Sequence, residues 1–170
     1  MSVNRDRFRR RQVAGGGGSG AGSLDITSVQ RLPNPAYSTT SATLVAIDDT
    51  NLPLTVTLGV GDKVYLSFCA PFGISSPGNV IGVDWLVDRP VSADLTIGSN
   101  AGAYAAGVIE PGTNGTDSNQ RIIEAEFTCT EAGVHVFKPR WKVSGGVTAY
   151  IPNSGIYTAL VNHRAIVKAA

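Results

Sequence analysis

Cysteine and histidine, the residues that most often form cross-links, bind metals or act as nucleophiles and bases, are scarce in this sequence. It has two cysteines, Cys69 and Cys129, and two histidines, each standing alone among strand-forming residues. Metal sites need several ligands at defined spacings, and two cysteines make no disulfide framework. They are either buried free thiols or one disulfide between neighbouring strands. The calcium-loop, phosphate-loop and G-x-S-x-G patterns are absent as well, so we predict no enzyme activity, no metal and no cofactor.

Asp84 and Asp88 flank Trp85 and are the pair of carboxylates that suggests a glycosidase. Residues four apart on a strand share a face and lie about 13 Å from each other by strand rise. This separation exceeds that of either class of glycosidase. We therefore interpret the two carboxylates as turn-capping and strand-edge residues.

Long apolar runs are also missing from the sequence. No stretch approaches the roughly eighteen apolar residues of a membrane span. The N-terminus is basic, but it continues into glycines and not into the apolar segment of a secretory signal. These absences predict a soluble protein that is assembled inside a cell and has no membrane partner.

Positive charge is concentrated at the N-terminus. Residues 1–22 hold five arginines and one aspartate, a net charge of +4, whereas the remaining 148 residues have a net charge of −3. The first twelve residues cannot bury enough surface to fold alone, and the glycine-rich stretch 14–23 spans about 18 Å as a random coil. An arm tethered in this way can reach a neighbouring subunit while the domain stays in place.

Three interpretations of this arm are open: neutralising the phosphates of packaged nucleic acid, docking to a protein partner, or plain solubility. We favour docking, in which the arginines pair with acidic groups and the aromatic residue fills a pocket. A net charge of +4 is weak for binding a whole genome, so nucleic acid is not the expected partner. The candidate docking residues are Arg5, Arg7, Phe8, Arg9, Arg10 and Arg11.

Short alternating segments dominate from residue 24 onwards. In 63–70, Val64 and Leu66 alternate with Tyr65 and Ser67. Further predicted strands are 24–32, 42–47, 54–58, 80–87, 91–97, 147–151 and 157–168. Twenty glycines, nine prolines and the lack of a helical period support the same interpretation. We predict an all-β domain over residues 24–170, an antiparallel β-sandwich or jelly roll of about 8–10 strands, behind a disordered or extended arm and linker at residues 1–23.

The central stretch 121–144 is predicted to form two strands folded back on each other. Glu124 and Glu126 alternate along the outgoing strand, and Lys138, Arg140 and Lys142 alternate along the returning strand. Opposite charges across a strand pair contribute roughly 0.2–1 kcal/mol per pair. We interpret these charges as the solvated outer face of a sandwich.

Residues 98–119 are the longest stretch without clear periodicity. Such insertions are often functional, and a surface loop with no defined role is the equal alternative. The candidate residues of an outer binding loop are Tyr104, Asn114 and Asp117, which would recognise host glycans. Glycan sites usually offer several aromatic side chains, whereas this stretch has one.

Three motifs support a resemblance over roughly residues 40–166. They are the turn Gly61-Asp62-Lys63-Val64, the strand end Val87-Asp88, and the run Ala132-Gly133-Val134-His135-Val136-Phe137 followed by Trp141. In this order they resemble the β-sandwich modules of tailed-phage structural proteins, which are similar to the tumour-necrosis-factor-like jelly roll. The resemblance implies a homotrimer exposed on a virion, as in capsid decoration, head-fibre and tail-appendage proteins.

We therefore expect a non-enzymatic phage structural protein that decorates or stabilises the capsid or a head fibre. Its arm would dock to the major capsid protein or to a neck or tail protein, placing the domain on the capsid exterior after assembly in the host cytoplasm. The first alternative is a tail-appendage receptor-binding module that recognises host glycans. The second is a small viral coat protein with a genome-binding arm.

Overall fold

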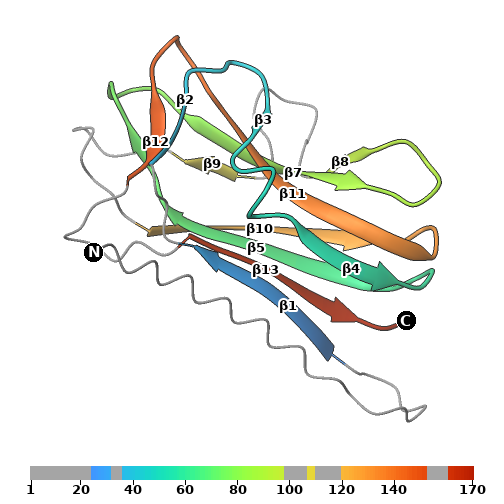
Figure 1. The fold of residues 1–170 in the computed structure, drawn as a ribbon. Coiled ribbons are helices and arrows are strands. Elements are labelled where there is room, and N and C mark those ends of the chain that lie inside the picture. Colours follow the sequence, from blue (N-terminus) through green and yellow to red (C-terminus); the bar gives the residue numbers. More distant parts are fainter. Residues whose placement is uncertain (1–23, 32–35, 98–106, 110–119, 153–160) are drawn as a thin grey trace, which may run out of the picture.

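The computed structural model of the protein describes residues 24–31, 36–97, 107–109, 120–152 and 161–170. Within these residues the chain forms thirteen β-strands and no helix. Figure 1 shows two large antiparallel sheets facing each other. The prediction of an all-β sandwich is confirmed.

The lower sheet in Figure 1 has four strands. Their order across the sheet is β1 (Leu24–Arg31), β13 (Val161–Lys168), β5 (Lys63–Pro71) and β10 (Gln120–Thr128). The pairing of β1 with β13 covers eight residues of each strand, and that of β5 with β10 covers nine. This four-stranded sheet is therefore a continuous ladder across most of its length.

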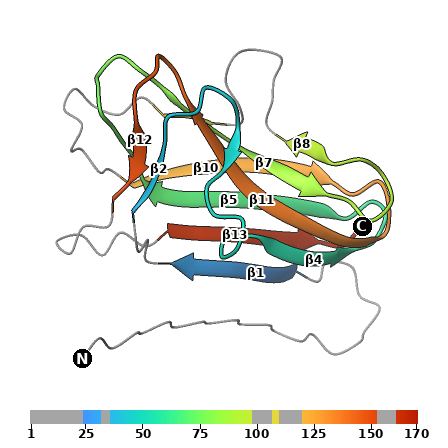
Figure 2. The ribbon, with the colours of Figure 1, turned by 45° about the horizontal axis from the view of Figure 1, so that its top comes forward.

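The upper sheet is built on two central strands, β11 (Gly133–Val143) and β7 (Ile81–Asp88). The outer edge of β11 carries β4 (Leu54–Leu58) and then β3 (Val45–Ala46). The outer edge of β7 carries β8 (Leu95–Ile97) and β9 (Gly107–Ile109). A third, small sheet of β2 (Tyr37–Thr39), β12 (Ala149–Ile151) and β6 (Gly73–Ile74) lies at one end of the sandwich (Figure 2).

The long strands pair from the two ends of the chain inwards. The strand β1 pairs with β13, β4 with β11, β5 with β10, and β7 with β8 and β9. Further pairing of β13 with β5, and of β11 with β7, joins these nested pairs into the two large sheets. First-with-last nesting across two antiparallel sheets is the jelly-roll arrangement.

Strict alternation along the strands makes the core. In β5 the buried residues include Val64, Leu66 and Phe68, each at most 1% exposed. In β13 the residues Val161 and Ala165 are fully buried. The inner faces of both large sheets contribute to one cluster, whose largest members are Trp85, Trp141, Phe68, Phe72 and Phe137. Because a strand alternates with period two, the less buried residues that alternate with these positions in β5 and β13 face away from the cluster.

A buried histidine joins the two sheets through this core. The Nε2 atom of His163 in β13 lies 2.9 Å from the indole nitrogen of Trp85 in β7, and its Nδ1 lies 2.8 Å from the carbonyl oxygen of Leu52. Since the indole N–H can only donate, Nε2 is the acceptor and Nδ1 carries the proton that Leu52 accepts. Burial lowers the pKa of His163 to about 4, so the ring is neutral at pH 7.

The turn between β4 and β5 shows how a short motif ends one strand and begins the next. A carboxylate oxygen of Asp62 accepts the N–H of Gly59 at 2.7 Å, and its other oxygen accepts the N–H of Ala170 at 3.1 Å. Gly61 adopts a φ of 92°, a conformation that side chains disfavour. The Gly-Asp turn therefore reverses the chain and also binds the C-terminal end.

The predicted hairpin over 121–144 is wrong. The strands β10 and β11 follow each other in sequence, but β10 pairs with β5 and β11 pairs with β7, in different sheets. Glu126 therefore forms its ion pair with Lys63, not with a basic residue of β11. Both strands were located by their alternation, but alternation does not specify which strands become neighbours.

Two predicted strands are much shorter than expected. The segment 42–47 contributes only β3, and the segment 91–97 only β8. The interpretation of Asp84 as a turn or strand-edge carboxylate is also wrong, because it lies within β7 and is fully buried beneath Arg140. Cys69 and Cys129 are free thiols, the first half-buried and the second buried.

Candidate functional site

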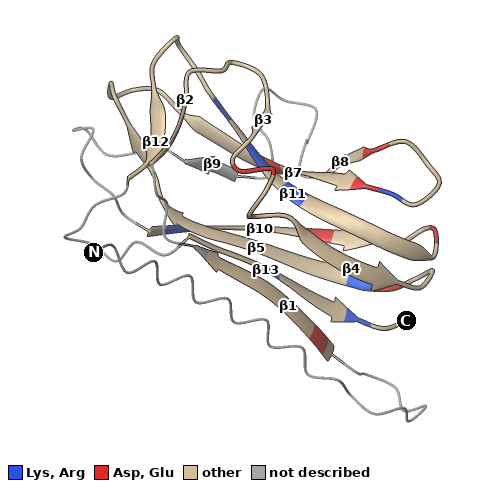
Figure 3. Cartoon of the chain, in the orientation of Figure 1, with Lys and Arg blue, Asp and Glu red and all other residues tan. Residues whose placement is uncertain are grey.

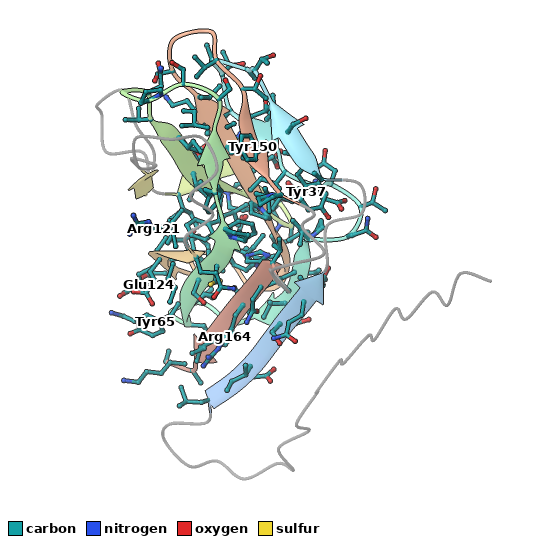
Figure 4. All side chains as sticks on the ribbon, turned by 90° about the vertical axis from the view of Figure 1, so that its left-hand side faces the viewer. Tyr37, Tyr65, Arg121, Glu124, Tyr150 and Arg164 are labelled. Carbon is teal, nitrogen blue, oxygen red and sulfur yellow. The ribbon has the colours of Figure 1, made fainter. Side chains whose placement is uncertain are left out.

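The outward side of the four-stranded sheet is the surface on which polar and apolar groups lack partners. We call it the open face and define it by the outward residues of the four strands in three rows across the sheet. By register these rows are Ile26–Ile166–Tyr65–Glu126, Ser28–Arg164–Ser67–Glu124 and Gln30–Asn162–Cys69–Ile122. Figure 4 shows Tyr65, Glu124 and Arg164 on the same side of the molecule.

Large apolar side chains are exposed on the open face. Ile122 is 67% exposed, Ile26 44% and Tyr65 40%. Scattered apolar residues are ordinary on protein surfaces, but these three lie on the same side of one sheet, on β10, β1 and β5. A hollow of about 530 Å³ lies on this face, and it is lined by Tyr65, Leu66, Ser67, Glu124, Ala125, Glu126, Arg164 and Ile166.

The central row of the open face carries two opposite charges that do not meet. Arg164 in β13 and Glu124 in β10 are separated by Ser67 in β5. The two strand spacings between them amount to roughly 10 Å from backbone to backbone. Neither side chain forms an ion pair or hydrogen bond with another described residue.

Two polar atoms beside this row are buried and unpartnered. Among the described residues, the Nε of Arg164 and the Oδ1 of Asn162 have no hydrogen-bond partner, although both atoms are covered. Leaving a buried donor or acceptor unsatisfied costs about 1–3 kcal/mol. The contacts within the described residues therefore leave these two groups of the open face unsatisfied. The neighbouring thiol of Cys69 is partly buried as well, which raises its pKa.

The charged side chains on the outward side of the six-stranded sheet are paired, although the Oδ1 of Asp88 is also buried without a hydrogen-bond partner among the described residues. Asp84 accepts two hydrogen bonds from the guanidinium of Arg140, at 3.0 and 2.9 Å, and Arg140 also donates to Thr96 at 2.9 Å. Lys138 lies 2.6 Å from a carboxylate oxygen of Asp88. Figure 3 shows the basic residues of β11 beside acidic residues of the same sheet.

Burial raises the pKa of the Asp84 carboxyl, against the opposing effect of the Arg140 guanidinium. Elsewhere Asp48 accepts hydrogen bonds from the backbone of Thr50 and Asn51 and from the hydroxyl of Tyr37. These hydrogen bonds hold the pKa of Asp48 below its usual value, although its partial burial acts in the opposite direction. Each of these carboxylates is occupied in holding strands or a turn together, so none is available to a substrate.

The described residues contain no group of three or more side chains placed to hold a metal ion. No helix long and apolar enough for a membrane crossing is found in the same residues. His135, buried next to Cys129, donates through Nδ1 to the carbonyl oxygen of Gly133 at 3.1 Å, and its Nε2 lies 3.9 Å from the thiol sulfur. Both side chains are enclosed, so this pair is part of the core.

The predicted site residues are not tested by this geometry. The arm residues Arg5, Arg7, Phe8, Arg9, Arg10 and Arg11, and the loop residues Tyr104, Asn114 and Asp117, lie outside the described residues. The open face was missed from sequence as a site. Its signal was present in each strand separately, since Tyr65 and Ser67 share a side of one segment and Asn162 and Arg164 share a side of another.

No protein-family model matches the chain, and no curated protein matches it in sequence. Two solved structures of infectious bursal disease virus are similar in part. The structure of its Gx strain is 11% identical with a TM-score of 0.36, over 85% of this chain and 37% of that chain. The VP2 subviral particle is 10% identical with a TM-score of 0.35, over 86% and 37%. The chain spans little more than a third of those chains, and TM-scores of this size carry no weight for its function.

Proposed function

We propose that this protein is a non-enzymatic structural component of a tailed-phage virion, a jelly-roll body that decorates or stabilises the capsid or a head fibre. The observation that carries the proposal is the open face. It combines exposed apolar residues with unpaired charges on a rigid sheet, which is the composition of a contact surface. The sequence motifs that resemble phage β-sandwich modules support the virion assignment.

In this proposal the protein acts by binding other proteins and does not catalyse a reaction. The described carboxylates with shifted pKa values hold turns and strands, and the histidine with a lowered pKa lies sealed in the core. A catalytic group would face a cavity that a substrate can enter. The hollow on the open face is instead bordered by Arg164 and Glu124, which suit a protein partner.

The N-terminal arm is the proposed anchor of the domain. Residues 1–23 precede β1, the edge strand of the four-stranded sheet, and their arginines and Phe8 would dock to the major capsid protein or to a neck or tail protein. A homotrimer would present three arms at once, and linked weak contacts raise the overall affinity by 10²–10⁴. The body would then remain on the capsid exterior.

Removing the arm tests this proposal. Virions assembled without this protein are incubated with the full chain or with the chain lacking residues 1–22, and bound protein is quantified after sedimentation of the particles. The full chain should bind, and the truncated chain should not, while its circular dichroism and melting temperature stay unchanged. Equal occupancy by the two chains would refute the anchor.

A second pair of chains separates charge from the aromatic contact. Replacing the five arginines by glutamine keeps Phe8, and Phe8→Ala keeps the arginines. Loss of binding in both variants is expected of a docking peptide. The two alternatives are glycan recognition through residues 98–119 and genome binding through the arm. Their candidate residues, Tyr104, Asn114, Asp117 and those of the arm, lie outside the described part, and no described residue favours them.

A further inference from the structure

We propose that the partner of the open face is a second copy of this chain, and that Arg164 of one copy pairs with Glu124 of the next. This inference rests on the proposed function as an assembly protein and names the occupant of its main contact surface. The inference is drawn from the charges, the burial and the strand register of the open face. Substitutions can change the two charges one at a time.

The first argument is that the open face is complementary to itself. Its central row carries the unpaired cation Arg164 in β13 and the unpaired anion Glu124 in β10. Both of these strands pair with β5. Within one chain they stay two strands apart. If two open faces meet with β5 over β5 and the strands parallel, Arg164 of each copy lies over Glu124 of the other.

The second argument is the burial of the cation. The Nε of Arg164 is covered and has no hydrogen-bond partner among the described residues, and the side chain as a whole is only partly exposed. The guanidinium is therefore already partly desolvated, and a carboxylate of a second copy would supply a charged acceptor to its terminal nitrogens. The Oδ1 of Asn162, on the same side of β13, is likewise covered and unpartnered among the described residues.

The third argument is the apolar rim around the charged row. Ile122 and Tyr65 are the exposed apolar residues nearest to Glu124 in β10 and β5, and Ile26 extends the surface on β1. Covering them excludes water from the ion pair, which strengthens it because the local dielectric falls. The hollow of about 530 Å³ offers room for a side chain from the opposite copy.

Other occupants fit the charges less well. A polyanion such as nucleic acid would face the exposed carboxylates of Glu124 and Glu126 next to Arg164. A strongly basic partner would face Arg164 itself, and Lys63 already pairs with Glu126 at 3.1 Å. A surface with both signs in one row suits a partner with the same two signs in reverse order, and a second copy has them.

The test is sedimentation equilibrium of the purified full chain without virions. Wild type should associate, and Arg164→Glu and Glu124→Arg should each weaken the association at least about tenfold, because each places like charges opposite each other. The double variant Arg164→Glu/Glu124→Arg restores opposite charges and should recover most of the wild-type association. An equimolar mixture of the two single variants should form mixed oligomers, which distinguishable tags identify.

Asp94→Arg is the matched control, since it makes the same change of charge as Glu124→Arg on an exposed residue away from the open face. It should leave association unchanged. Melting temperatures of all variants establish that they fold. A wild-type chain that stays monomeric at millimolar concentration, or single variants that associate like wild type, would overturn the proposal. Because no virion is present, such a result is independent of the anchor experiment.

Discussion

The two outer faces of the sandwich treat their charges in opposite ways. On the six-stranded sheet, Arg140 pairs with Asp84 and Lys138 pairs with Asp88, each across adjacent strands. On the open face, Arg164 and Glu124 have β5 between them and remain apart. The same alternation of charged residues along a strand thus gives paired charges on the six-stranded sheet, which we call the closed side, and unpaired charges on the open face.

Strand order accounts for this difference. Acidic β7 and basic β11 are hydrogen-bonded neighbours, so their outward charges meet within a single strand spacing. Basic β13 and acidic β10 both pair with β5 and never with each other. A charged residue is therefore a stabilising partner or an available contact depending on the strand beside it. The following variants test this contrast.

The largest effect is expected on the closed side, from Asp84→Asn. Asp84 is fully buried and receives two hydrogen bonds from Arg140, so the substitution leaves a buried guanidinium without its anion. Breaking a buried pair from one side costs about 3 kcal/mol. Urea unfolding at pH 7 measures the loss. The control is Glu126→Gln in an exposed ion pair, for which we expect a far smaller change. Equal losses in the two variants would contradict the contrast.

The core beneath both faces should make stability depend on pH. His163 has a pKa of about 4 when folded against an ordinary value of 6.5. Between these values the unfolded chain binds more protons, so the stability present above pH 6.5 falls as the pH drops towards 4. The loss over this interval is about 3 kcal/mol.

Urea midpoints measured from pH 7 to 4 report this loss. The matched control is His163→Gln, whose amide can accept the Trp85 N–H but does not titrate. We expect its midpoint to vary much less across the same interval. An identical pH profile in wild type and variant would show that other groups cause the acid sensitivity.

A smaller effect is expected from Lys138→Ala, also on the closed side. Its ion pair with Asp88 is close, at 2.6 Å, but both side chains are partly exposed. Such pairs contribute no more than about 1 kcal/mol. Thermal unfolding in low and high salt measures the contribution, which added salt should reduce. If Lys138→Ala lost as much stability as Asp84→Asn, the greater exposure of the Lys138–Asp88 pair would not explain a smaller contribution to stability.

The smallest effect on the folded monomer is expected from Arg164→Met on the open face. Methionine keeps much of the length of the side chain and removes the buried, unpartnered Nε. We expect the free energy of unfolding to change by no more than about 0.5 kcal/mol, measured at concentrations below the onset of association. A loss above about 1 kcal/mol would show that Arg164 has a stabilising role within one chain. That result would weaken its assignment as a contact residue.

Local pattern was a good guide to individual strands. The segments 54–58 and 63–70 match β4 and β5 closely, and the predicted alternation of Val64 and Leu66 with Tyr65 and Ser67 is confirmed by their burial. The predicted hairpin over 121–144 was wrong because the pattern did not show which strands pair with each other. Adjacent strands of opposite charge suggest a hairpin, but in a jelly roll the chain crosses from one sheet to the other at that turn.

The sequence by itself determined the all-β class, the alternation of most strands and the separation of a basic arm from the domain, because these depend on neighbouring residues and their period. Only the tertiary structure decided that Arg140 meets Asp84 while Arg164 does not meet Glu124. Strand order joins segments far apart in the chain, such as β1 with β13, through backbone hydrogen bonds that any sequence can make. The order of the strands in each sheet depends on how the whole core packs. That strand order leaves Arg164 and Glu124 apart on the open face.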